Sequence, residues 1–142
     1  MQDNPLKLFI LSCTTFGVGG LSGGALGVVW IHIQGEFGLP LSALGLLVMM
    51  STIGRLLTSS ASGFLIGRFG IGWVLVGGMS LTVLGTLSFA LAPVWILFLL
   101  SAFISGVGGG VMATGINAFA AINFSPSRMN WLHAGFGLGA TL

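Results

Sequence analysis

Charge of either sign is what this sequence has least of. Its 142 residues include four lysines and arginines and two acids, 4% of the chain, against roughly a quarter in a soluble domain. Six formal charges cannot cover the surface of a soluble fold of this size. Apolar residues make up 55% of the chain. The composition therefore excludes a soluble domain and predicts an integral membrane protein whose first partner is the lipid bilayer.

Other residue types that carry chemistry are also scarce. Cys13 is the one cysteine, which excludes an internal disulfide bond. The net charge is only +2 and no basic cluster occurs, so we expect no nucleic-acid partner. His32 and His133 lack the spacing of metal ligands, and we expect neither a metal nor a cofactor. The N-terminal MQDNPLK lacks the basic region of a cleaved signal, so the first apolar run is expected to stay in the membrane.

Long apolar runs are abundant. A bilayer core about 30 Å thick needs roughly 20 apolar residues per helix, and the sequence supplies four such runs and part of a fifth. We expect helices at about 8–33, 42–66, 73–91, 95–122 and 131–142. The last measures about 18 Å, so we expect the chain to end inside a helix. The predicted fold is an all-α membrane protein.

Tryptophans and loop charges indicate how the chain crosses the membrane. All four tryptophans fall near expected helix ends, as in interfacial aromatic belts: Trp30, Trp73, Trp95 and Trp131. Lys7, Arg68 and Arg128 lie on one side, whereas Glu36 lies on the other. The positive-inside rule then predicts a multi-pass protein of the cell (inner) membrane with a cytoplasmic N-terminus.

Glycines four residues apart recur along the expected helices. Such pairs let another helix backbone approach closely, and they are Gly19/Gly23, Gly20/Gly24, Gly23/Gly27, Gly63/Gly67 and Gly106/Gly110. They fit either generic helix packing or packing that slides during a conformational cycle. The segment GVGG occurs at 17–20 and again at 106–109, in helices of opposite direction, as an inverted repeat of a transporter would place it.

Arg55 lies in the middle of the second expected helix, about 20 Å from Arg68. A cation at this depth normally faces a bundle interior or a wet cavity. Three interpretations stay open: Arg55 lines a cavity and binds substrate, it pairs with an acid elsewhere in the protein, or the helix boundary is misplaced.

Thr114 and Asn117 lie three residues apart and share one face of the fourth helix. The amide of Asn117 offers a donor and an acceptor together, which suits a sugar hydroxyl. An interhelical hydrogen bond is the alternative.

A serine-nucleophile motif is the one indication of an enzyme. Residues 20–24 fit G-x-S-x-G, and Ser22 would need a base within hydrogen-bond reach. Both histidines are expected at membrane surfaces, far from Ser22, so we expect no enzyme.

Between the second and third helices, GFLIGRFGIG (63–72) resembles the signature G-x-x-x-D-R-x-G-R-R of major facilitator superfamily transporters. Gly63, Arg68 and Gly70 fit, and Gly67 stands in place of the acid. Arg68 suits the negative end of a helix dipole, and Gly70 permits a tight reversal. The resemblance implies a cytoplasmic gate that includes these three residues and Arg128.

The last 26 residues, NAFAAINFSPSRMNWLHAGFGLGATL, resemble the helix-four to helix-five segment of fucose-permease-like sugar transporters. The resemblance implies part of the N-terminal six-helix bundle of a twelve-helix transporter. It also implies a small-molecule substrate, by preference a sugar. From their positions in the helices, we expect Asn117, Thr114 and Arg55 to line its binding site.

Protons are an open candidate for coupling. Family members often carry an acid in helix four, where this chain has MATGIN around Ala113. An intramembrane carboxylate with a raised pKa is the usual proton carrier, and both acids of this chain lie outside the expected spans. The alternatives to a sugar transporter are a transporter of another solute class, such as an organic anion or a drug, and a non-transporting membrane subunit.

Overall fold

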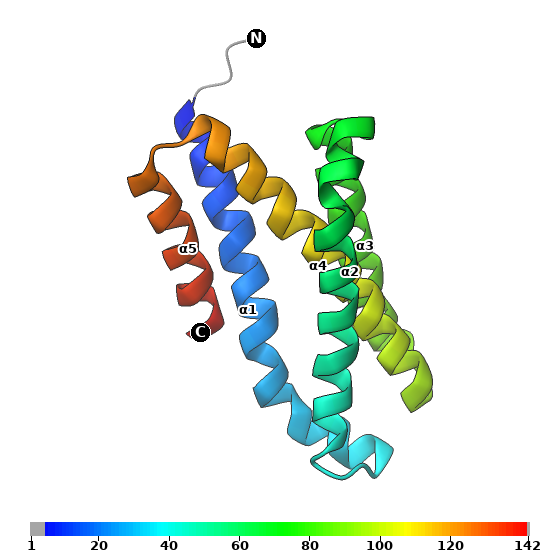
Figure 1. The fold of residues 1–142 in the computed structure, drawn as a ribbon. Helices are drawn as coiled ribbons and strands as arrows, with labels where there is room; N and C mark the ends of the chain where they lie inside the picture. Colours follow the sequence, from blue (N-terminus) through cyan, green and yellow to red (C-terminus); the bar gives the residue numbers. More distant parts are fainter. Residues whose placement is uncertain (1–4, 142) are drawn as a thin grey trace. The chain divides into compact units, whose positions relative to one another are not determined.

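The computed structural model describes residues 5–141, and every regular element there is an α-helix (Figure 1). The helices are α1 (Pro5–Phe37), α2 (Ala43–Phe69), α3 (Ile71–Leu91), α4 (Trp95–Asn123) and α5 (Pro126–Thr141). Helices α1 to α4 are long and apolar enough to cross a membrane. Helix α5 has 16 residues, about 24 Å, which is shorter than a bilayer core. The predicted all-α membrane fold with four spans is confirmed.

Helix α1 continues past its expected end at residue 33. The segment from Gln34 to Phe37 contains no proline, and its one glycine, Gly35, does not interrupt the helical hydrogen bonding. Glu36 therefore lies in the last turn of α1 and not in a loop. The break comes at Gly38, whose φ of 62° is left-handed, and Pro40 follows. The polar residues after position 33 had led to a predicted end of α1 that is four residues too early.

One residue, Gly70, connects α2 to α3. Its φ of 78° and ψ of 153° lie in a region open essentially to glycine alone. Its N–H donates to the Ile66 carbonyl at 2.9 Å, and its carbonyl accepts from the Val74 N–H at 3.2 Å. The predicted tight reversal at Gly70 is confirmed. The expected non-helical stretch from 67 to 72 is wrong, because each helix continues up to this glycine.

Helix α5 begins at Pro126, five residues before its expected start. Proline suits the first helical position because its missing N–H would have no partner there. The Ser125 carbonyl accepts the Met129 N–H at 3.1 Å, which closes the first turn. Arg128 therefore lies in this first turn and not in the loop assigned to it from the sequence.

The chain divides into two compact units. The first, here the α1–α5 unit, contains α1 up to His32, the end of α4 from Ala118, and α5. The second, the α2–α4 unit, runs from Ile33 to Asn117.

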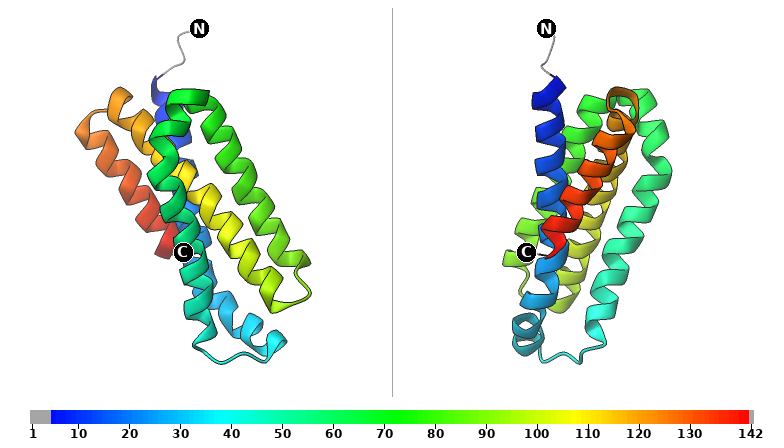
Figure 2. Two further views of the ribbon diagram at one scale, coloured as in Figure 1. Left: turned by 45° about the vertical axis from the view of Figure 1, so that its right-hand side comes forward. Right: turned by 90° about the vertical axis from the view of Figure 1, so that its left-hand side faces the viewer.

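In the α2–α4 unit, α2 and α4 run in the same direction and α3 runs against them (Figure 2). Glycines of α4 contact both neighbours: a Cβ on Gly106 would overlap the backbone of Ser51 in α2, and one on Gly108 would overlap Thr82 in α3. From α2, a Cβ on Gly54 would lie 2.5 Å from the Phe103 carbonyl oxygen. The run GVGGG thus places α4 against both other helices at backbone distance.

In the α1–α5 unit, α1 and α5 lie side by side (Figures 1 and 2). A Cβ on Gly20 would overlap the Phe136 carbonyl, and one on Gly139 would overlap the Gly17 carbonyl. Gly19 and Gly23 have nothing within 4 Å of such a Cβ. Of the five glycine pairs, only Gly20/Gly24 and Gly106/Gly110 therefore have both members at a helix contact.

The left-handed backbone at Gly70 yields a stability prediction. We expect Gly70→Ala to destabilise the protein by about 1–3 kcal/mol, because alanine disfavours this conformation. The control is Gly67→Ala, where the glycine is helical and a Cβ meets nothing within 4 Å. The control should be neutral or stabilising by up to about 1 kcal/mol. Thermal unfolding in detergent, followed by tryptophan fluorescence, measures both; equal melting temperatures would contradict the role of Gly70.

The α1–α5 contact gives a second prediction. We expect Gly20→Val to lower stability by about 1–3 kcal/mol, because the added side chain meets backbone that cannot yield. Gly23→Val lies on the same helix with open space around its Cβ and serves as the matched control. The same thermal unfolding measurement compares the two variants. An equal loss of stability in both would mean that the helix propensity of valine, and not the α1–α5 contact, causes the effect.

Candidate functional site

The glycines of α4 bring polar side chains of α2 close to those of α4. Arg55 and Thr58 belong to α2, and Thr114 and Asn117 belong to α4. These four residues, here called the polar strip, all lie within the α2–α4 unit.

Arg55 is exposed in the middle of α2. Its backbone packs on Gly110, where an added Cβ would lie 2.6 Å from the Arg55 carbonyl oxygen. Its Nη2 atom lies 4.0 Å from the Cβ position of Gly109. Within residues 5–141 the only acid is Glu36, and no ion pair is found for Arg55. The guanidinium thus lies beside the glycine run of α4, and no acidic side chain among the described residues neutralises its charge.

Thr58 forms the hydrogen bond between α2 and α4. Its hydroxyl lies 3.1 Å from the Val107 carbonyl oxygen and 2.9 Å from that of Gly54. A Cβ on Gly110 would overlap this hydroxyl, so the glycine makes the approach possible. The sequence alone did not identify Thr58 as part of the site. The signal that could have identified it is the pairing of a mid-span threonine with a glycine run on another helix.

Asn117 differs from the two threonines of the strip in its hydrogen bonding. The Thr114 hydroxyl donates to the Gly110 carbonyl one turn earlier. Asn117 is half-buried, and its Oδ1 atom is covered without a hydrogen-bond partner in the described part of the chain. Buried polar atoms nearly always have a partner, and an exception indicates a bound water or ligand. This oxygen is therefore the best candidate in the strip for contacting a solute.

The candidate gate residues do not all fall in one unit. Arg68 lies in the last turn of α2, exposed, with its guanidinium carbon 5.8 Å from the centre of the Phe69 ring. Gly70 follows directly, whereas Gly63 is exposed two turns earlier with nothing near its Cβ position. Arg128 belongs to the α1–α5 unit, 5.7 Å from the Phe9 ring centre. Within the α2–α4 unit, Arg68 and Gly70 are thus close neighbours, and Gly63 lies apart from them.

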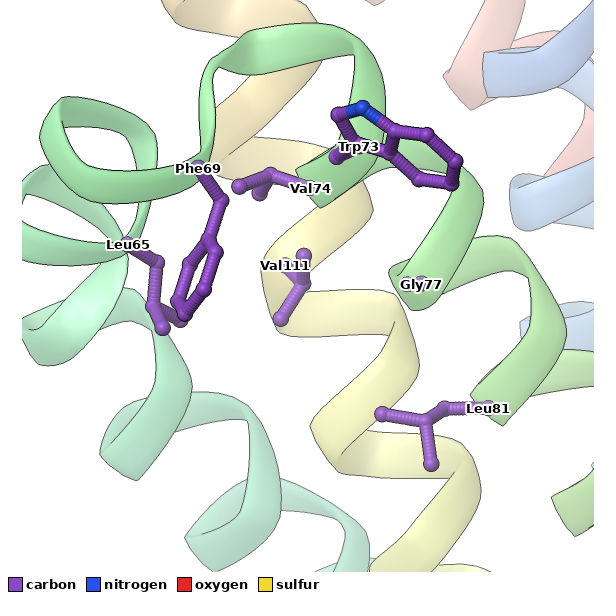
Figure 3. Close-up of a pocket in the computed structure, with 8 residues that line it drawn as sticks. Leu65, Phe69, Trp73, Val74, Gly77, Leu81 and Val111 are labelled. Atoms are coloured by element: carbon purple, nitrogen blue, oxygen red, sulfur yellow. The ribbon is translucent and has the colours of Figure 1, made fainter.

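The α2–α4 unit contains an apolar groove of about 320 Å³ (Figure 3). It is lined by Leu65, Phe69, Trp73, Val74, Gly77, Gly78, Leu81 and Val111. None of the polar strip lines it. The groove offers almost no polar surface to a hydroxylated or charged solute, so we keep the polar strip as the candidate binding site.

Ser22 has none of the surroundings of a nucleophile. Its hydroxyl lies 3.1 Å from the Val18 carbonyl, to which it donates within its own helix. The His133 ring instead lies edge-on to Phe16, with 5.9 Å between ring centres. Among the described residues, no group of three or more His, Cys, Asp or Glu is placed to hold a metal ion.

Apolar spans that carry polar side chains and one unpaired cation far from the helix ends define a class: multi-pass membrane proteins with a functional site inside their spans. The family comparison identifies which. The model of the Major Facilitator Superfamily matches residues 9–142, so the chain belongs to this superfamily. Comparisons with curated proteins and with solved structures gave no match. The protein is thus part of a family of secondary transporters of small molecules, and not of enzymes.

The covered oxygen of Asn117 gives a prediction about stability. We expect Asn117→Leu, of similar size, to raise the free energy of unfolding by about 1–3 kcal/mol, because it removes an unpaired polar atom. Asn123→Leu is the control, since Asn123 is exposed and its Nδ2 donates to the Phe119 carbonyl at 2.9 Å. Thermal unfolding in detergent without substrate measures both. A loss of stability in Asn117→Leu would mean that the amide is already satisfied.

Proposed function

We propose that this protein transports a sugar-type solute across the cell membrane by alternating access. Superfamily membership supports secondary transport, and the sugar class is supported by the resemblance of residues 117–142 to fucose-permease-like transporters. The chain then contributes to the N-terminal bundle, with its N-terminus in the cytoplasm.

Asn117 carries the assignment to a polar, hydroxylated solute. Its amide offers an acceptor and donors at one point, which matches a hydroxyl that both donates and accepts. Its covered oxygen has no partner within residues 5–141, so its hydrogen bond is unused and becomes available to a ligand when the helices around it move apart. Thr114, one turn away on the same helix, uses its hydroxyl hydrogen internally but keeps acceptor capacity.

Arg68, Gly70, Gly63 and Arg128 form the proposed cytoplasmic gate. In alternating access, helical bundles move as nearly rigid bodies around a central site. Gly70 suits this role because a single-residue connection makes the ends of α2 and α3 move together. Arg68 favours the negative C-terminal end of α2 and keeps that end at the cytoplasmic surface.

Uptake of labelled sugars tests the proposal. The protein, expressed from its full reading frame, is reconstituted in vesicles and offered a panel of monosaccharides with and without an inward proton gradient. We expect saturable uptake of at least one sugar, and Asn117→Ala should raise its KM about threefold to tenfold through one lost hydrogen bond. Ser60→Ala is the control, because Ser60 is exposed on α2 and bonds only to the Leu56 carbonyl.

Uptake measured with and without the proton gradient shows whether sugar transport is coupled to protons. No carboxylate lies mid-span among residues 5–141, so these residues favour uptake that equilibrates. Accumulation driven by the proton gradient would require a carboxylate elsewhere in the protein. Failure of every sugar, with folded protein in the vesicles, would refute the substrate class.

A further inference from the structure

Arg55 holds the one charge of α2 that lies far from both helix ends. Keeping a cation at this depth is costly, and such residues are normally paired with an acid or face a functional site. Within residues 5–141, no acid pairs with it. The small residues of the neighbouring helix α4 indicate where an anionic ligand could lie beside Arg55.

Gly109, Ala113 and Asn117 follow one another at four-residue spacing and form a stripe along α4. Its first two members have little or no side chain, and all three are half-buried. The Arg55 Nη2 lies 4.0 Å from the Cβ position of Gly109. The stripe itself therefore adds no bulky side chain between the two ends at Gly109 and Asn117.

The length of this stripe limits what could bind along it. Eight residues separate Gly109 from Asn117, a rise of about 12 Å. A ligand that contacts both residues is therefore larger than a single small ion, and a monosaccharide with a hydrogen bond at each end has the right scale.

From this arrangement we propose that the transported solute is an acidic monosaccharide, whose carboxylate binds Arg55 while a hydroxyl at its far side binds Asn117. The planar guanidinium fork matches a carboxylate in two parallel hydrogen bonds. One cation balances one carboxylate, whereas a phosphate ester carries nearly two negative charges. The inference rests on the proposed sugar transport and narrows its substrate class.

The test compares an acid with its uncharged ester. Reconstituted protein takes up labelled glucuronate or galacturonate, and each is competed with its own methyl ester, which keeps the ring and hydroxyls but not the charge. We expect the wild-type protein to prefer the acid by about tenfold or more, as hydrogen bonds between charged groups allow. Arg55→Gln should raise KM for the acid by about tenfold or more and change inhibition by the ester less than twofold.

Two further variants separate binding from folding. Arg55→Lys keeps the charge and loses the fork, so it should retain part of the preference for the acid. Lys7→Gln removes one positive charge from an exposed position outside the polar strip and should leave the preference unchanged. If Arg55→Gln yields no folded protein, the wild-type preference and the Arg55→Lys variant still decide.

The outcomes distinguish this inference from the transport proposal. Uptake of neutral sugars, with an ester that competes as well as its acid, overturns the carboxylate assignment and leaves sugar transport intact. Equal effects of Arg55→Gln on acid and ester would make Arg55 structural and overturn the assignment too. Failure of acids, esters and neutral sugars together refutes sugar transport itself.

Discussion

The close approach of α2 to α4 is the constraint on which the polar strip depends. In lipid, no hydrophobic force drives helices together, so they associate where small residues let their backbones meet. Gly106 and Gly110 provide this along α4, against Ser51 and Arg55 of α2. Since Ser51 and Arg55 meet these glycines through backbone atoms, this packing sets the register of α2 against α4. The height of Arg55 on α4 follows from that register.

This packing also explains how a nearly uncharged chain can carry polar groups inside its spans. Every hydroxyl at mid-span must find a carbonyl, because lipid offers no hydrogen bond. Most bond within their own helix, as Ser60 does to Leu56. Thr58 also reaches the Val107 carbonyl of α4 at 3.1 Å, which only a glycine at position 110 permits. Asn117 has no such partner among residues 5–141, and this contrast sets it apart from the structural hydroxyls.

The sequence was sufficient for the spans and for Gly70, because bilayer thickness and the needs of a reversal each follow from local rules. Helix ends were less predictable, because hydropathy indicates which residues lie in lipid and not where helical hydrogen bonding stops. Helix α1 therefore continues to Phe37 and α5 begins at Pro126, both beyond the expected bounds. Nor could the sequence say that Gly20 meets another helix while Gly23 meets nothing, since that depends on a distant partner. Thr58 was missed for the same reason. The binding and gating roles of the strip and of Arg68 remain proposals.

The end of α2 shows how a departure from a family pattern changes the physics of a connection. Gly67 stands where the superfamily signature has an acid, so Arg68 cannot pair with a carboxylate at that position. Its guanidinium lies 5.8 Å from the Phe69 ring centre instead, a contact worth about 0.5–1 kcal/mol at an exposed site. The backbone of Gly70 holds both helices through its N–H and its carbonyl. Because hydrogen bonds between backbone atoms do not titrate and are insensitive to salt, a gate built on this connection would be governed by geometry more than by charge.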